Sequence, residues 1–200
     1  MNEPIYQRKD YKIIQHLHYM LMNVDGLVWL LTGENYNPRI DITFRDRIEN
    51  KPLSYGQVSI AIGEAGLINT RKLYQFLGLT THPKKHHLVE SQKRFPEDVD
   101  ITDLDNSEKI TTNNLLAAWH NDPIVITAVT HTLLAVNKGV AHFTVDGVEG
   151  ARRDYTLITA QVGLLLVEER VQTKNYPLQD YRFWTKQPVP GSALPPGRGS

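Results

Sequence analysis

The sequence contains no cysteine. This absence excludes disulfide bonds, catalysis by a thiolate and zinc sites that use cysteine ligands. Three glycine motifs are missing as well: the dinucleotide-binding G-x-G-x-x-G, the P-loop and the nucleophile elbow G-x-S-x-G. Their absence argues against a dinucleotide-dependent dehydrogenase, a P-loop NTPase and an α/β-type serine hydrolase.

The sequence also lacks an excess of charge of either sign. Lys plus Arg and Asp plus Glu number 22 each, so the formal net charge is zero. A domain that binds duplex DNA usually carries a basic excess, because the phosphates that it neutralises supply much of its affinity. The overall charge therefore gives no support for strong nucleic-acid binding, and it leaves room for a local basic site only.

Long apolar runs are missing too. No stretch approaches the roughly 18 to 20 apolar residues that a membrane crossing requires. Residues 1–4, MNEP, lack the basic and apolar regions of a signal peptide. We therefore expect a cytoplasmic protein without a membrane contact, and a length of 200 residues suits one domain with a substantial core.

What the sequence does contain is helical periodicity. Apolar residues recur at three- and four-residue steps, the pattern of an amphipathic helix, in four long segments: about 10–31, 55–77, 123–142 and 151–172. Gly33 and Gly78 follow the first two segments as stop signals, and Pro123 suits a first helical position. The sequence predicts an all-α fold, an antiparallel four-helix bundle, in a single domain over residues 1–184.

The connections are less regular. A short helix is expected over residues 112–119, and residues 80–107 are interpreted as a long loop with little structure of its own. Residues 185–200 are rich in Pro, Gly and Ser and predict a flexible tail. The β-branched runs 124–130 and 156–162 would also suit strands. They lack strict alternation and follow helix start signals, so a helix is favoured.

The most informative segment covers residues 133–144, LLAVNKGVAHFT, at the expected end of the third long helix. It places Asn137, Lys138 and His142 within about one and a half helical turns. A histidine can move a proton near neutral pH, because its unperturbed pKa is about 6.5. The residues alone favour another interpretation, in which His142 caps the helix or hydrogen-bonds within the bundle.

This segment resembles the signature of the HEPN (higher eukaryotes and prokaryotes nucleotide-binding) superfamily, especially its bacterial abortive-infection-like members. In those proteins an Arg-Asn-Lys-x-x-Ala-His string closes a long helix. The resemblance extends back to residues 68–77, INTRKLYQFL, and forward to the helix that follows Arg152 and Arg153. It covers roughly residues 55–172, and its diagnostic part is about a dozen positions.

The resemblance implies an all-α bundle, a homodimer and, in active members, RNA cleavage that needs no metal and no cofactor. There an arginine stabilises the phosphorane charge and a histidine moves a proton. The resemblance makes His142, Asn137 and Lys138 the candidate catalytic residues, and it makes Arg152 and Arg153 the candidate RNA-binding residues.

This sequence departs from the motif at one position. Val136 stands in place of the arginine. Lys138 or Arg152 could supply positive charge, but a lysine does not reproduce the bidentate fork of a guanidinium. A non-catalytic member of the family is therefore an equal alternative to an active one.

Two further clusters are weaker. His82, His86 and His87 lie close together, but no further ligand stands at a spacing such as H-E-x-x-H, so a solvated loop is favoured and no metal site is predicted. Arg71 and Lys72 could add local positive potential for RNA, although such surface charge usually serves solvation.

Three functional hypotheses follow. The leading one is a HEPN-like protein that acts on RNA in a bacterial toxin or phage-defence setting, with an antitoxin or another protein as a further partner. The second is a non-catalytic helical module that binds another protein. The third, a helical DNA-binding protein, lacks a basic recognition helix.

Overall fold

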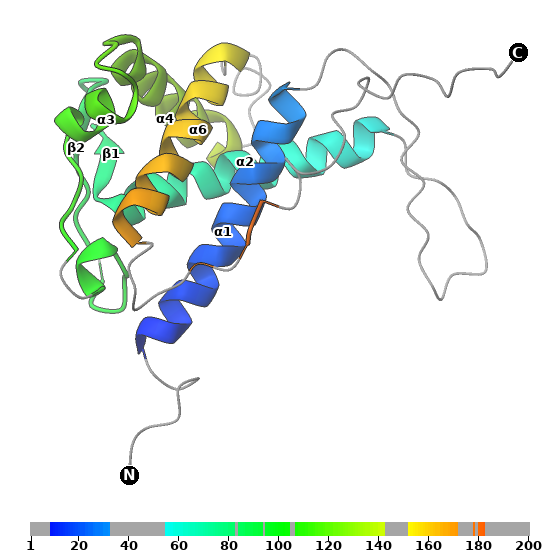
Figure 1. Cartoon of the computed structure of the whole chain (residues 1–200). Coiled ribbons are helices and arrows are strands. Elements are labelled where there is room, and N and C mark those ends of the chain that lie inside the picture. The colour runs from blue at the N-terminus through cyan, green and yellow to red at the C-terminus, as the bar shows by residue number, and fades with distance from the viewer. Residues whose placement is uncertain are drawn as a thin grey trace, which may run out of the picture.

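The computed structural model describes residues 9–32, 55–82, 84–93, 95–104, 107–142, 152–171, 178 and 180–182. Helices dominate these parts of the chain (Figure 1): α1 (Lys9–Thr32), α2 (Tyr55–Leu77), α3 (Thr112–Ala118), α4 (Ile124–His142) and α6 (Arg153–Val171). The remaining elements are two short strands and one 3-10 turn: β1 (Leu79–Thr81), β2 (Leu88–Glu90) and η2 (Ile101–Asp103).

The four long helices lie close to their predicted positions. α1 ends at Thr32, directly before Gly33, and α4 begins directly after Pro123. α2 ends at Leu77, and the next residue, Gly78, has a φ of 101°, the left-handed conformation that glycine adopts after a helix. The mainly α-helical class is confirmed, and both β-branched runs are helical.

The interpretation of residues 80–107 as a largely unstructured loop is wrong. β1 and β2 form an antiparallel pair in which Thr80 lies opposite Val89. Further along, the Asp100 carboxylate accepts a hydrogen bond from the Thr102 backbone N–H, and the Asp103 carboxylate accepts one from the Asp100 backbone N–H. This reciprocal capping box starts η2. The fold is therefore not all-α as predicted, because the mainly helical chain also contains one small sheet.

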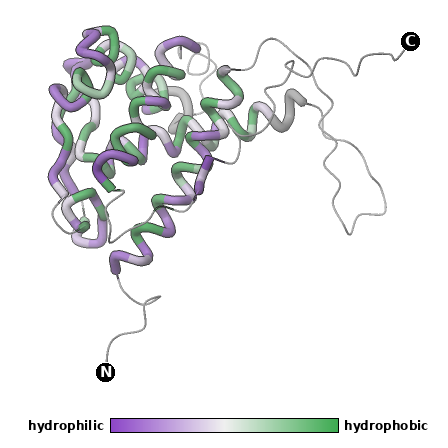
Figure 2. The backbone as a smooth tube through the Cα atoms, in the orientation of Figure 1, coloured by the Kyte–Doolittle hydropathy of each residue, from purple (hydrophilic) through white to green (hydrophobic). Residues whose placement is uncertain are grey.

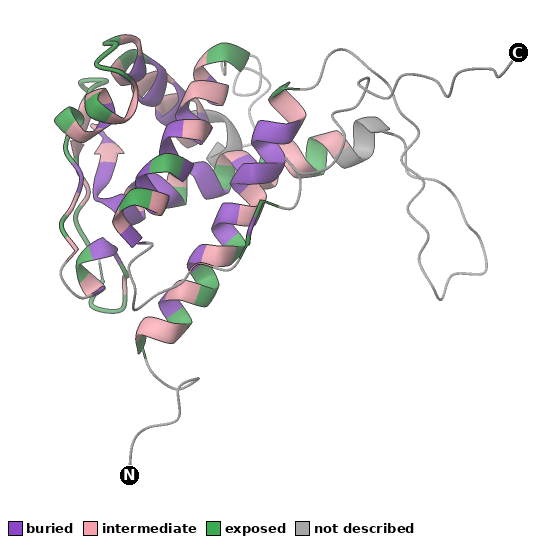
Figure 3. Cartoon of the chain, in the orientation of Figure 1, coloured by how far each residue is buried: buried purple, intermediate pink, exposed green. Residues whose placement is uncertain are grey.

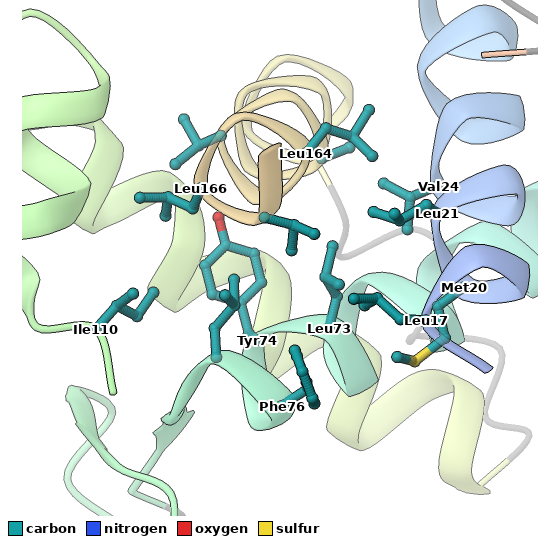
Figure 4. Packing of buried hydrophobic residues seen from close by; sticks show 14 of the residues in the cluster. Leu17, Met20, Leu21, Val24, Leu73, Tyr74, Phe76, Ile110, Leu164 and Leu166 are labelled. Carbon is teal, nitrogen blue, oxygen red and sulfur yellow. The ribbon is translucent and has the colours of Figure 1, made fainter. Parts of the chain in front are cut away.

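The core lies where the long helices meet. Figure 2 shows hydrophobic and hydrophilic residues alternating along α1, and Figure 3 shows the buried residues concentrated in α1, α2, α4 and α6. Figure 4 shows side chains of α1, α2 and α6 converging in this cluster, among them Leu17, Leu21, Val24, Leu73, Tyr74 and Leu166. Full burial of such a side chain contributes about 1.5–3 kcal/mol.

Helices α1 and α2 cross at very short range. The crossing point is Gly66 of α2, where an added Cβ atom would lie 2.4 Å from the Leu27 Cβ atom. Three residues earlier, a Cβ atom on Gly63 would meet only the end of the Leu30 side chain, at an ordinary 3.6 Å. The absence of a side chain at Gly66 is therefore what allows the two helices to approach.

Two predictions lie beyond what the structure describes. The tail over residues 185–200 lies outside the described residues, so the domain limit at residue 184 stays a prediction.

Within the described ranges, no helix has the combination of length and apolar character that spanning a bilayer demands.

Candidate functional site

The predicted motif closes a long helix, because α4 runs through Asn137 and Lys138 and ends at His142. The half-buried Asn137 amide Nδ2 donates a hydrogen bond to the Thr81 Oγ1 atom at 3.1 Å. This bond joins α4 to β1, so the fold itself uses the amide of a residue that we predicted to be catalytic. The side chains of Lys138 and His142 lie outside the described part of the structure.

Val136, at the position of the family's arginine, is a core residue. Its exposed fraction is 2%. A guanidinium in the space that Val136 occupies would be buried, and burying a charge is costly unless it is paired. The departure from the motif is therefore built into the packing of α4.

The two candidate RNA-binding arginines flank the start of α6. The Arg152 guanidinium pairs with the Asp154 carboxylate at 2.7 Å and lies 4.0 Å from the centre of the Tyr155 ring. The hydrogen bond between Arg152 and Asp154 raises the pKa of Arg152 and lowers the pKa of Asp154. Arg153 donates two hydrogen bonds, of 3.1 and 2.8 Å, to the Leu31 carbonyl oxygen in the last turn of α1. A cation there stabilises carbonyls that lack helical partners.

One residue near this site was missed by the sequence analysis. His131 of α4 lies edge-on against the Tyr155 ring, with 5.4 Å between ring centres, and its buried Nδ1 atom has no hydrogen-bond partner among the described residues. Tyr155 thus contacts both Arg152 and His131. The signal in the sequence was spacing, because positions 131, 138 and 142 fall on one face of a helix.

A second candidate site is a cavity of about 990 Å³ between the first half of α1, the last turns of α2 and the segment 90–100. We call it the basic hollow. Its lining includes Lys9, Lys12 and His16 of α1, Arg71 and Lys72 of α2, and Phe95. Positions 9, 12 and 16 share one helix face. Arg71 and Lys72 stand out in the sequence as a basic pair, but no local pattern connects them with α1.

Most carboxylates of the segment that borders the basic hollow are already paired. Asp103 accepts hydrogen bonds from Lys9, at 2.7 Å, and from Lys93. The Asp100 carboxylate lies 3.7 Å from the Lys93 Nζ atom and 3.6 Å from the Lys109 Nζ atom. Partial burial alone would raise the pKa of Asp103, but the hydrogen bonds from Lys9 and Lys93 outweigh it and lower the pKa to about 2. These hydrogen bonds and ion pairs connect Lys93 and Asp103 with Lys9 at the start of α1.

Replacing Asp103 by asparagine is expected to lower the free energy of unfolding at pH 7 by about 1 kcal/mol after solvent screening. The pKa of Asp103 is lower in the folded protein than in the unfolded chain. Its contribution to the free energy of unfolding is therefore complete above a pH of about 3.9, the ordinary pKa of an aspartate, and disappears as the pH falls toward 2. Urea unfolding of both proteins between pH 7 and pH 2 measures this. The difference should shrink below pH 4, and a constant difference would contradict the ion-pair role. Glu97→Gln, which alters an exposed carboxylate of the same segment, should leave stability unchanged.

The histidine cluster shapes a turn. The His82 Nδ1 atom accepts hydrogen bonds from the backbone N–H groups of Lys84 and Lys85, at 3.2 and 3.1 Å. The rings of His82 and His87 stack with 5.5 Å between their centres. Within the described ranges, no group of three His, Cys, Asp or Glu side chains is arranged to hold a metal ion.

Comparison of the chain with models of protein families, with curated proteins and with solved structures finds no match. The resemblance to the HEPN superfamily therefore stays a prediction that rests on the sequence motif.

Proposed function

We propose that the protein recognises RNA as a HEPN-like helical protein and does not cleave it. The proposal rests on one observation. The segment that resembles the HEPN signature closes the long helix α4, as it does in that family, while two positions of the motif do not offer the group that cleavage would use: a buried valine, Val136, stands in place of the arginine, and the Asn137 amide is bonded to Thr81.

The contacts of the two arginines argue against cleavage. Cleavage requires a cation directed at the charge that develops on the phosphorane. Arg152 is paired with Asp154, and Arg153 donates to the Leu31 carbonyl. Neither guanidinium is free to change partners without breaking a contact of the folded state.

We also propose the assembly that the resemblance implies. The four long helices would form an antiparallel bundle, and two copies would form a homodimer in a cytoplasmic toxin–antitoxin or phage-defence setting. The packing of α1 on α2 and α6, and of α4 on α6, supports the bundle. Light scattering after size exclusion should give twice the chain mass of 22.8 kDa.

Incubation of the purified protein with tRNA and total RNA tests the proposal. We expect neither the wild type nor His142→Ala to cleave RNA, and we expect the wild type to retain RNA on a filter with an affinity that falls as salt rises. Cleavage by the wild type that His142→Ala abolishes would establish a nuclease instead. If the wild type retains no RNA at low salt, the RNA proposal fails.

A protein-interaction module is the second candidate, and exposed apolar side chains favour it. Ile60 and Ile68 of α2 are 62% and 37% exposed and, eight residues apart, fall on one helix face. Exposed apolar side chains that gather on one face often mark a protein contact. If Ile68→Lys converts a dimer to a monomer while RNA retention is unchanged, this face is the contact between subunits.

A further inference from the structure

We infer that the basic hollow, whose described lining residues include none from α4, binds a single strand of RNA. The choice of RNA rests on the proposed function, whereas the location and the preference for a single strand follow from the residues that line the hollow. Three observations carry the inference: unpaired cations, an unsatisfied guanidinium donor and an exposed aromatic ring.

The first observation is the balance of charges that remain unpaired. Lys12, Arg71 and Lys72 form no ion pair with any described residue, whereas Lys9 and Lys93 are held by Asp103. Among the described residues that line the hollow, Glu97 is the one carboxylate without a hydrogen bond or ion pair. Positive charge therefore remains in the hollow, although the chain as a whole is neutral. An anionic chain would be attracted there.

The second observation is the Arg71 guanidinium. Its Nε atom is buried and has no hydrogen-bond partner in the described structure, while the side chain as a whole is half-buried and lines the hollow. A buried donor without an acceptor is costly. A phosphate in the hollow would be met by the accessible part of the guanidinium, whose planar set of donors matches phosphate geometry.

The third observation is Phe95, an aromatic residue that favours a nucleic-acid strand over other polyanions as the ligand of the hollow. Its side chain is 60% exposed at the hollow, and its backbone N–H donates to the Asp98 carboxylate at 3.0 Å, which fixes the turn that carries the ring. An exposed ring beside cations is the arrangement that proteins use for single strands: the cations follow the backbone and the ring stacks on a base. Bases in a duplex are already stacked, and an acidic polypeptide has no bases.

The test is fluorescence anisotropy with a short labelled oligouridine and the full chain. The first variant, Arg71→Gln combined with Lys72→Gln, removes two of the unpaired cations. We expect it to weaken binding by about 10-fold or more and to reduce the slope of log affinity against log salt by about 1.4, which is about 0.7 for each of the two cations. The second variant, Phe95→Ala, should weaken binding by about 5- to 100-fold with little change in the salt slope, because only stacking is lost.

The matched control is Lys84→Gln combined with Lys85→Gln. It makes the same change in net charge on the exposed turn between β1 and β2, and neither residue lines the hollow. We expect its affinity to stay within about twofold of the wild type, because non-contacting surface charges act only through screened long-range potential. Thermal melts of all three variants should match the wild type, since Lys72, Phe95, Lys84 and Lys85 are exposed and Arg71 has no hydrogen-bond or ion-pair partner in the described part of the chain.

Several outcomes would overturn the inference. Equal weakening by the hollow variant and the control would mean that only net charge matters. Equal affinity for oligouridine and a duplex RNA would remove the single-strand preference. Competition by polyglutamate as strong as that by oligouridine, with no effect of Phe95→Ala, would indicate an acidic polypeptide. If the wild type binds RNA but the hollow variants bind equally well, only this inference fails. If the wild type binds no RNA, the proposed function fails with it.

Discussion

Replacing Tyr74 by alanine is expected to lower the free energy of unfolding by about 3–5 kcal/mol. The Tyr74 side chain is completely buried, and Figure 4 shows its ring extending from α2 toward α6. Its hydroxyl donates a hydrogen bond to the Thr159 carbonyl oxygen at 3.0 Å. Alanine would leave a large cavity between the two helices. Urea denaturation with a fluorescence or circular dichroism readout measures the loss.

Tyr74→Phe is the matched variant, because it keeps the ring and removes only the hydroxyl. We expect it to cost about 1 kcal/mol, the usual net value of one hydrogen bond. Burial raises the pKa of Tyr74 well above its ordinary value of 10, so the phenol should stay neutral in the folded protein. If phenylalanine and alanine destabilised the protein equally, ring packing would not be the source of the stability.

Gly66→Ala is expected to destabilise the protein by about 2 kcal/mol, although alanine has the higher helix propensity. The added methyl group would lie 2.4 Å from the Leu27 Cβ atom and 3.0 Å from the Asn23 carbonyl oxygen, so α1 and α2 would have to separate. Strain from such overpacking typically costs about 1–3 kcal/mol. The free energy of unfolding from urea titration tests this.

Gly63→Ala, in the same helix, should have the opposite sign. Its new methyl group would meet Leu30 at an ordinary distance of 3.6 Å, so the gain in helix propensity of about 0.5–1 kcal/mol should remain. Comparison of Gly66→Ala with Gly63→Ala separates the effect of the close helix crossing on the free energy of unfolding from the effect of helix propensity. Two stabilised variants would show that α1 and α2 do not approach closely at Gly66.

The helices could be predicted because their signals are local. The spacing of apolar residues identified the buried faces of α1 and α2. Gly78 marked the end of α2, because glycine readily adopts the left-handed backbone conformation that often follows a helix. β1 and β2 could not be predicted in the same way. Each strand is three residues long, too short for a period of two to stand out, and each is defined by its partner rather than by its own residues.

The candidate sites could be predicted only in part, because they depend on contacts between distant segments. The position of Asn137 at the end of α4 was predictable, but its bond to Thr81 joins residues 56 apart in sequence. Likewise, Arg71 and Lys72 were recognised as a basic pair. That they share a cavity with Lys12 follows from how α1 and α2 are placed, which no local pattern encodes.

The contacts at the two ends of α1 have a consequence for biosynthesis. Lys9, its first residue, pairs with Asp103, and the Leu31 carbonyl in its last turn accepts from Arg153; these partners are 94 and 122 residues away. A ribosome releases the N-terminal helix long before either partner has been made. α2 is made soon after α1 and covers part of its apolar surface, but the part that packs against α6 should stay uncovered until α6 emerges. Completion of folding should therefore depend on α6, because such distant pairings form slowly.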